Sequence, residues 1–239
     1  VVRVPGDRRD GIDALAGLLH ETAWRHAEHS GLGFHALERK GLLWVVSRFR
    51  IHAGTMPCRG DMIMIRTWPR HMDRLFAYRD FEIVDGHDAV IARATGMWVI
   101  IDMNTRKPVN MQPFRNCFIF HSEKVLDNKL NRLPPVDEPA FHRSITVDWQ
   151  DLDFNHHVNN LNYIRWILRT IPSRILSDHA VSDLAINHLG EGRLGDHLLA
   201  TVAKLSGNPL VCHGEIITRD HRNVLARIRL ELNPVSRKE

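Results

Sequence analysis

The run from Asp151 to Asn160 concentrates side chains that can move protons and hold a developing negative charge. It contains two carboxylates, three amides and two imidazoles. It lies directly ahead of Leu161 to Ile171, whose apolar pattern predicts a helix. The start of a helix offers free backbone N–H groups and a partial positive charge. Polar groups beside such a terminus suit chemistry on a carbonyl, because the oxygen that becomes negative can be held there.

Three of these side chains alternate along the chain. The strand pattern from Ser144 to Trp149 indicates that the following segment is extended, and in an extended chain Asp153, Asn155 and His157 would point to one face. The carboxylate can orient the imidazole, accept a proton or attack a carbonyl. The amide can donate to an oxyanion or hold a water, and the imidazole can exchange protons near neutral pH.

The end of the run is predicted to start the helix. Asn159 or Asn160 fits the N-cap position, and the N–H groups beside them would lie on the oxyanion side of a bound carbonyl. The alternative interpretation is that the whole run is a turn rich in capping residues, where Asp, Asn and His are common.

A further carboxylate, Glu191, is predicted at the end of a strand that begins at Leu184. Glycines at 190 and 192 flank it and allow a bulge or a close approach of backbone. Glu191 could help to activate water there. Alternatively, it is an exposed charge paired with Arg193.

Other kinds of site find less support in the sequence. No G-x-S-x-G turn is present, and Cys212 lies in an apolar strand pattern that is typical of a buried thiol. His156 would face away from its neighbour in an extended chain, and the 16 histidines form no H-E-x-x-H ligand set. We therefore expect no metal and no other cofactor.

The composition is that of an ordinary globular protein. The chain has 239 residues, of which 44% are hydrophobic and 25% charged, so it suits one large domain or two small ones. Its formal net charge of +4 includes no basic block dense enough for nucleic-acid binding. Three widely spaced cysteines argue against a disulfide framework and favour the reducing cytoplasm. The longest apolar runs are strand-length, so we expect no membrane span.

One order of elements occurs twice. A helix is predicted from Ile12 to His29 and another from Asn160 to Thr170, and a run of strands follows each. The predicted strands cover Leu42–Ile51, Asp61–Trp68, Arg74–Val84 and Ala89–Asp102 in the first half, and Leu184–Leu189, Asp196–Ala200, Pro209–Thr218 and Val224–Leu232 in the second. Gly60-Asp61 and Gly195-Asp196 each open a strand. Two such copies would form one long sheet around two central helices.

The halves are joined by a connector from Arg106 to Glu138, which is long for a plain loop and is expected to cross the surface. Pro134-Pro135 cannot lie inside a helix or a central strand, so we place the boundary there. The predicted domains are residues 1–133 and 134–239.

The stretch from Val147 to Leu168 resembles the signature of acyl-ACP thioesterases, with D-x-N-x-H-V-N-N followed by a Tyr and a Trp at fixed offsets. The likeness extends over most of the chain and is greater to the bacterial branch than to the plant enzymes. It implies an α+β tandem hot-dog fold, with two long central helices wrapped by a continuous antiparallel sheet. It also implies that Asp153, Asn155, His157 and Glu191 are the catalytic residues.

The chain departs from the plant pattern at one position, because Gly192 stands where plant enzymes commonly carry a cysteine. A carboxylate-and-water mechanism therefore fits better than a cysteine nucleophile. The first half, at Val4 to Gly11, has no equivalent of Asn155 and His157, so we expect one active site per chain. The first domain would shape the acyl pocket, with Trp44 and Met62 as candidates that are equally typical of an ordinary core.

The resemblance implies hydrolysis of fatty acyl-acyl carrier protein in fatty acid biosynthesis. The partner would be an acidic carrier protein bearing a phosphopantetheine-linked acyl chain, which a mildly basic enzyme attracts. The alternatives are a thioesterase for acyl-CoA or polyketide-type chains, a hydratase, and a non-catalytic acyl-binding protein on the same fold. We expect no nucleic-acid partner, and exposed sheet edges could pair two copies into a homodimer.

Overall fold

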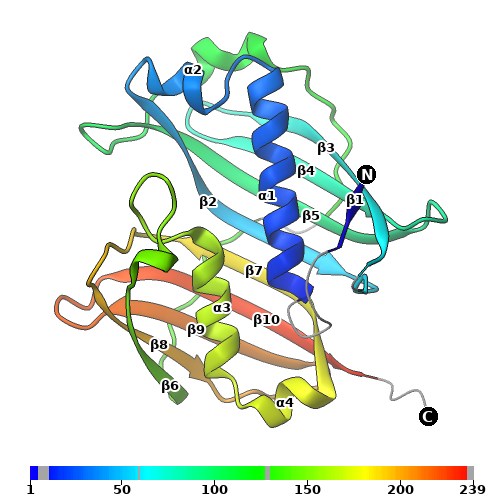
Figure 1. Cartoon of the computed structure of the whole chain (residues 1–239), viewed down its shortest axis with the longest axis vertical. Coiled ribbons are helices and arrows are strands. Elements are labelled where there is room, and N and C mark those ends of the chain that lie inside the picture. The colour runs from blue at the N-terminus through cyan, green and yellow to red at the C-terminus, as the bar shows by residue number, and fades with distance from the viewer. Residues whose placement is uncertain (5–10, 59, 127–129, 236–239) are drawn as a thin grey trace. The chain divides into compact units, whose positions relative to one another are not determined.

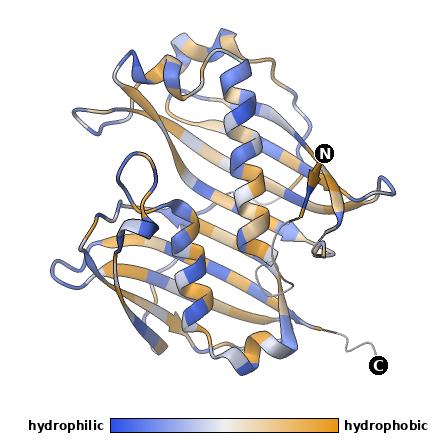
Figure 2. Cartoon of the chain, in the orientation of Figure 1, coloured by the Kyte–Doolittle hydropathy of each residue, from blue (hydrophilic) through white to orange (hydrophobic). Residues whose placement is uncertain are grey.

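The computed structural model describes residues 1–4, 11–58, 60–126 and 130–235, and the chain divides into two compact units, Val1–Leu130 and Asn131–Glu239. In each unit a helix packs against an antiparallel sheet (Figure 1). Apolar and polar residues alternate along many of the strands, as expected for sheets with one face on a core (Figure 2). None of the helices in these ranges is long and apolar enough to cross a membrane.

The first unit is built on a long helix and a sheet with the strand order β1-β3-β4-β5-β2, in which all neighbours are antiparallel. Its elements are β1 (Val2–Arg3), α1 (Gly11–His29), α2 (Phe34–Glu38), β2 (Leu42–Ala53), β3 (Met62–Met72), β4 (Ala77–Val84), β5 (Val90–Asp102) and a 3-10 turn at Gln112–Cys117. The predicted helix is confirmed, because its apolar stripe is buried: Leu15 and Leu19 are at most 2% exposed. Each such leucine stabilises the fold by about 1.5–3 kcal/mol.

The second unit repeats this plan with the strand order β7-β10-β9-β8-β6, again antiparallel. Its elements are β6 (Pro139–Thr146), a 3-10 turn at Trp149–Asp151, α3 (Asn160–Thr170), α4 (Ser173–Asp178), β7 (His179–His188), β8 (His197–Ala203), β9 (Leu210–Thr218) and β10 (Val224–Pro234). The α+β prediction is confirmed. The predicted second helix is confirmed with the same bounds, and it ends where Pro172 follows its C-cap and precedes a separate short helix.

Helix α3 lies close on its sheet because a glycine on β9 leaves room for it. A Cβ at Gly214 would come within 2.8 Å of the Ile167 side chain. Ile164 and Ile167 are both buried at this contact. The glycine therefore sets how near the helix, and the loop that precedes it, can approach the strands.

The two units share one local arrangement of hydrogen bonds around the Gly-Asp pair at the start of β3 and of β8. In the first, Val4 exchanges backbone hydrogen bonds with Gly60 and Asp61, and the Asp61 carboxylate accepts the Cys58 N–H at 2.7 Å. In the second, Val147 does the same with Gly195 and Asp196, and the Asp196 carboxylate accepts the Arg193 N–H at 2.8 Å.

We call this arrangement the latch. Gly60 and Gly195 both have positive φ, 89° and 82°, which explains why glycine opens each strand. The valine just after β1 is thereby tied to the start of β3, and the valine just after β6 to the start of β8. The duplication read from the sequence thus extends to individual hydrogen bonds.

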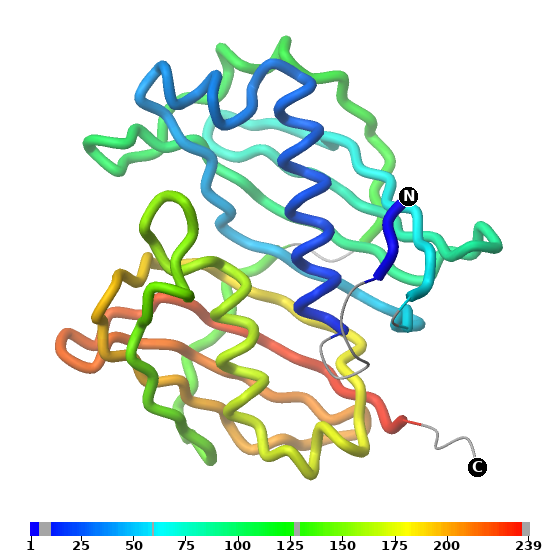
Figure 3. The backbone as a smooth tube through the Cα atoms, in the orientation of Figure 1, coloured from blue at the N-terminus to red at the C-terminus, as the bar shows by residue number. Residues whose placement is uncertain are grey.

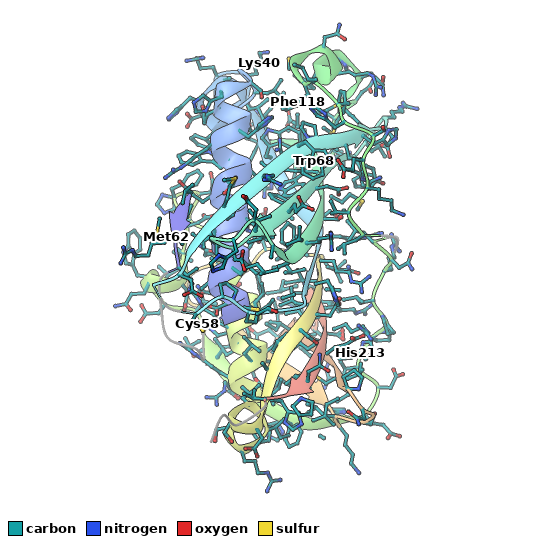
Figure 4. The ribbon with its side chains drawn as sticks, turned by 90° about the vertical axis from the view of Figure 1, so that its right-hand side faces the viewer. Lys40, Cys58, Met62, Trp68, Phe118 and His213 are labelled. Carbon is teal, nitrogen blue, oxygen red and sulfur yellow. The ribbon has the colours of Figure 1, made fainter. Side chains whose placement is uncertain are left out.

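The connector runs over the sheet surface within each unit, as predicted. In the first, Trp68 Nε1 donates to the Glu123 carbonyl and the Val125 N–H donates to the buried Asp80 carboxylate; Figure 4 shows this segment passing beside β3 and β4. In the second, the Leu133 N–H donates to Asn187 Oδ1 at 2.7 Å. These side chains satisfy a stretch of backbone that has no regular secondary structure.

Candidate active site

The segment between β6 and α3 is a tight loop rather than an extended strand. Strand β6 ends at Thr146, and Trp149 to Asp151 form a 3-10 turn. The Asp153 N–H donates to the His157 carbonyl at 2.8 Å, and the His156 N–H donates to the Asp153 carbonyl at 3.0 Å. The strand expected from Ser144 is confirmed as far as Thr146. The extended conformation expected for the segment with Asp153, Asn155 and His157 is wrong, because local turn hydrogen bonds replace strand pairing there. Figure 3 shows the loop beside the start of α3.

The carboxylate of Asp153 organises this loop. Its Oδ1 accepts the backbone N–H of Asn155 at 2.8 Å and that of His157 at 3.3 Å. His156 takes a left-handed φ of 59°, which lets the chain reverse between them. The three predicted side chains thus belong to one turn, although strand alternation is not what brings them together.

His157 faces the carboxylate of Glu191 across the site. The distance from His157 Nε2 to Glu191 Oε2 is 3.4 Å, and the two side chains are 21% and 35% exposed. A paired imidazole and carboxylate that remain open to solvent can take a proton from water and return it. Sequence position alone, 34 residues apart, could not have established this contact.

Glu191 lies in the loop after β7, beyond the strand that was expected to carry it. The loop is anchored where the N–H groups of Leu189 and Gly190 both donate to the Leu225 carbonyl, at 2.8 and 3.1 Å. It is joined to the loop of Asp153 and His157 where the Val158 N–H donates to the Gly192 carbonyl at 2.9 Å. A Cβ at Gly192 would lie 2.8 Å from Val158, so the glycine is required for this approach.

Tyr163 on α3 also positions this loop, and the sequence analysis missed it. Its side chain is 1% exposed, and its hydroxyl accepts the Gly192 N–H at 2.9 Å. Burial, with smaller contributions from the nearby Glu191, Asp196 and Asp153 charges, raises its pKa to about 12. The hydroxyl therefore stays protonated. In the sequence it resembles any aromatic residue on the apolar face of a helix.

More of the polar groups at the start of α3 are hydrogen-bonded within the protein than the sequence predicted. Asn159 is the N-cap, and its Oδ1 accepts the Leu161 N–H at 3.0 Å. The Asn159 N–H donates to the Asp151 carbonyl and the Asn162 N–H to the Asn159 carbonyl. Asn159 therefore does not supply a backbone donor to an oxyanion, because the protein already uses it. Asn160 is the first helical residue.

A buried amide, also missed, holds the helix start to the 3-10 turn. Asn162 is 7% exposed, and its Nδ2 donates to the Asp151 carbonyl at 3.0 Å. This contact keeps the turn before the catalytic loop in register with α3.

Other candidate groups have structural roles or lie elsewhere. Burial raises the pKa of Cys212 to about 12, so this thiol is protonated and unreactive at neutral pH. Trp44 packs in the core of the first unit and donates to the Leu32 carbonyl at 2.8 Å, whereas Met62 is 46% exposed at the start of β3 (Figure 4). Within the described ranges, no three His, Cys, Asp or Glu gather as a metal site would require. The segment expected to lack a second site, residues 5–10, lies outside the described residues.

Two models of known protein families match this chain. A family model described as the acyl-ACP thioesterase N-terminal domain matches residues 6–114, and one described as the C-terminal domain matches residues 136–232. The chain belongs to the acyl-ACP thioesterase family. The C-terminal match contains the whole loop from Val147 to Asn159 and the loop that carries Glu191.

Curated acyl-ACP thioesterases align with most of this chain. The palmitoyl-acyl carrier protein thioesterase of Gossypium hirsutum is 32% identical over 218 residues, which are 85% of this chain and 52% of the cotton protein. The oleoyl-acyl carrier protein thioesterase of Coriandrum sativum is 30% identical over 198 residues, 75% of this chain and 54% of the relative. The chain spans about half the length of the curated relatives it matches.

Solved structures of acyl-ACP thioesterases share the fold. One from Bacteroides thetaiotaomicron has a TM-score of 0.83 at 25% identity, covering 93% of this chain and 89% of that chain. The 12:0-ACP thioesterase of Umbellularia californica has a TM-score of 0.85 at 24% identity, covering 98% and 94%. The tandem hot-dog prediction is thereby confirmed.

Proposed function

We propose that this protein hydrolyses the thioester of fatty acyl-acyl carrier protein and releases a free fatty acid. The observation that carries the proposal is the 3.4 Å contact of His157 with Glu191. This contact joins the loop that carries Asn155 and precedes α3 to the loop after β7, in a chain of this family. We assign catalysis to the domain of residues 134–239, and we assign the shaping of the acyl pocket to residues 1–133.

The first chemical step is attack of water on the thioester carbonyl. The paired Glu191 and His157 accept one proton from the water, and its oxygen forms a bond to the carbonyl carbon. The carbonyl electron pair moves onto oxygen. The Asn155 amide and the start of α3 at Asn160 stabilise that oxyanion. One such donor is typically worth about 3 kcal/mol in the transition state.

The second step expels the thiol of the phosphopantetheine arm. The oxyanion re-forms the carbonyl, the C–S bond breaks, and the accepted proton passes from His157 to the leaving sulfur. The products are a carboxylic acid and the carrier-protein thiol, so no other reactant is needed. An imidazole that is 21% exposed can reach both the water and the sulfur.

We assign Asp153 the role of a positioning residue. Two loop N–H groups already bind its Oδ1, which fixes the turn that presents Asn155 and His157. Direct attack by Asp153 is the competing mechanism. Rapid-quench mass spectrometry separates them, because direct attack forms a covalent acyl–Asp153 anhydride during turnover, whereas attack by water forms no covalent acyl-enzyme.

The proposal is tested with purified protein and palmitoyl-acyl carrier protein. We expect His157→Ala and Glu191→Gln each to lower kcat at least a hundredfold, with unchanged circular dichroism. His156→Asn is the matched control: it alters the adjacent, exposed imidazole, and asparagine tolerates the left-handed φ at that position. Full activity in both test variants would remove the proposed site.

The rival substrates are distinguished by direct comparison. A kcat/KM for palmitoyl-CoA or a polyketide-type thioester above that for the carrier-protein thioester would reassign the substrate. No turnover together with tight fatty-acid binding would support a non-catalytic acyl-binding protein. We further propose that the protein acts in fatty acid biosynthesis in the cytoplasm, and cell fractionation tests this location. We also propose that two copies pair through their sheet edges to form a homodimer, which analytical ultracentrifugation would detect.

A further inference from the structure

A cluster of arginines lies along the outside of the catalytic helix. Arg143 on β6, Arg165 and Arg169 on α3, and Arg174 on α4 come from three consecutive helices and strands of the second unit. Over these three elements the sole acidic residue is Asp178, at the end of α4. Such a concentration of one charge is unfavourable unless water or an anionic partner covers it.

Hydrogen bonds place Arg143 beside Arg169. The Arg143 guanidinium donates from Nε and Nη2 to the Arg169 carbonyl, at 3.0 and 2.6 Å, so β6 and the end of α3 adjoin there. Arg165 lies four residues before Arg169 and therefore on the same side of the helix. Arg174 is the second residue of α4, the helix that follows Pro172.

Three of these arginines are exposed to a partner. Arg143, Arg169 and Arg174 are exposed, and among the described residues no carboxylate pairs with them. On the same helix as Arg165 and Arg169, Leu161 and Leu168 are only partly buried. The surface therefore offers positive charge beside apolar side chains, the complement of an acidic amphipathic helix.

The position of the surface relative to the site also fits a carrier protein. Helix α3 begins at Asn160, beside the catalytic loop, so Arg165 and Arg169 lie roughly 8 and 14 Å farther along its axis. A phosphopantetheine arm attached to a protein bound there can extend along the helix toward His157. An unrelated anion-binding role would not require this continuity with the site.

We propose that this surface, formed by Arg143, Arg165, Arg169 and Arg174 with Leu161 and Leu168, docks the acidic helix of the acyl carrier protein. The inference rests on the proposed thioesterase function and adds the partner surface to it. Electrostatic attraction at such a surface mainly raises the association rate, and salt weakens it.

The test is the double charge reversal Arg169→Glu with Arg174→Glu. We expect about a tenfold rise in KM for palmitoyl-acyl carrier protein, a flatter salt dependence, and unchanged kcat/KM for palmitoyl-CoA, which needs no docking. The matched control is Arg39→Glu with Lys107→Glu, two exposed cations of the first unit that produce the same change in net charge. An equal effect of the control pair, or no effect of the test pair, would overturn the proposal.

A binding measurement separates this inference from the proposed activity. Holo acyl carrier protein is titrated into the Glu191→Gln protein with and without the two reversals. If the chain binds the carrier protein through this surface but hydrolyses no thioester, the docking proposal stands and the proposed function fails. If the chain hydrolyses thioesters but the two reversals leave carrier-protein binding unchanged, the proposed function stands and the docking proposal fails.

Discussion

His20 makes the stability of the first unit depend on pH. Its ring packs edge-on against Phe49, with ring centroids 4.8 Å apart. The residue is partly buried, but its Nε2 lies out of reach of solvent and has no hydrogen-bond partner among the described residues. Burial lowers the pKa of His20 from 6.5 to about 4. The folded protein therefore holds this imidazole neutral where an unfolded chain would protonate it.

The size of the effect follows from the two pKa values. Between pH 6.5 and pH 4, His20 is mainly protonated in the unfolded chain and mainly neutral in the folded protein. Because the unfolded state binds more protons, it becomes more stable relative to the folded state as the pH falls through this range. Linkage with these values lowers the free energy of unfolding by about 2 kcal/mol between pH 7.5 and pH 5.0. Above pH 7 the contribution vanishes.

The assay is urea unfolding of the wild type and of His20→Leu at both pH values. We expect the loss on acidification to be about 2 kcal/mol smaller in the variant. His26, whose pKa burial and the adjacent Arg79 also lower to about 4, acts in the same direction in both proteins and cancels from the comparison. An identical pH dependence of the two proteins would refute the reasoning.

Three further predictions concern the second unit. Tyr163→Phe leaves the Gly192 N–H without its acceptor, which should cost about 1–3 kcal/mol of stability and lower kcat more than it changes KM, as steady-state kinetics would show. Gly192→Cys should lower kcat instead of adding a nucleophile, because its Cβ would meet Val158; covalent acyl-enzyme in mass spectra would contradict this. Gly214→Ala should destabilise by about 1–3 kcal/mol in urea through contact with Ile167, with little change in kcat.

Periodic features of the sequence predicted the elements well because burial imposes them. The apolar stripe of α1 and the alternation along β2 to β5 follow from a helix or strand with one face on a core. The Gly-Asp pairs marked strand starts because a positive φ is needed there. The connector was recognised from its prolines, which cannot join a central strand.

The candidate site was predicted in its residues but not in its geometry. Asp153, Asn155 and His157 were grouped as if on a strand, whereas side-chain-to-backbone bonds of Asp153 form a turn. Such local bonds compete with strand pairing and leave no periodic pattern. The contacts of Tyr163 with Gly192 join residues 29 apart, which no local pattern reveals.

The latch has a consequence for how long the segment behind it can be. In the second unit twelve residues, 148–159, separate the latched valine from the helix, whereas six, 5–10, do so in the first. In general, a loop of twice the length costs only about 0.6 kcal/mol more in chain entropy to close. In both units the segment starts at the valine of the latch and ends at a helix. The second unit therefore accommodates six additional residues between the latch and the helix. The latch and the helix stabilise the fold, and the loop between them is free to carry the residues of the proposed site.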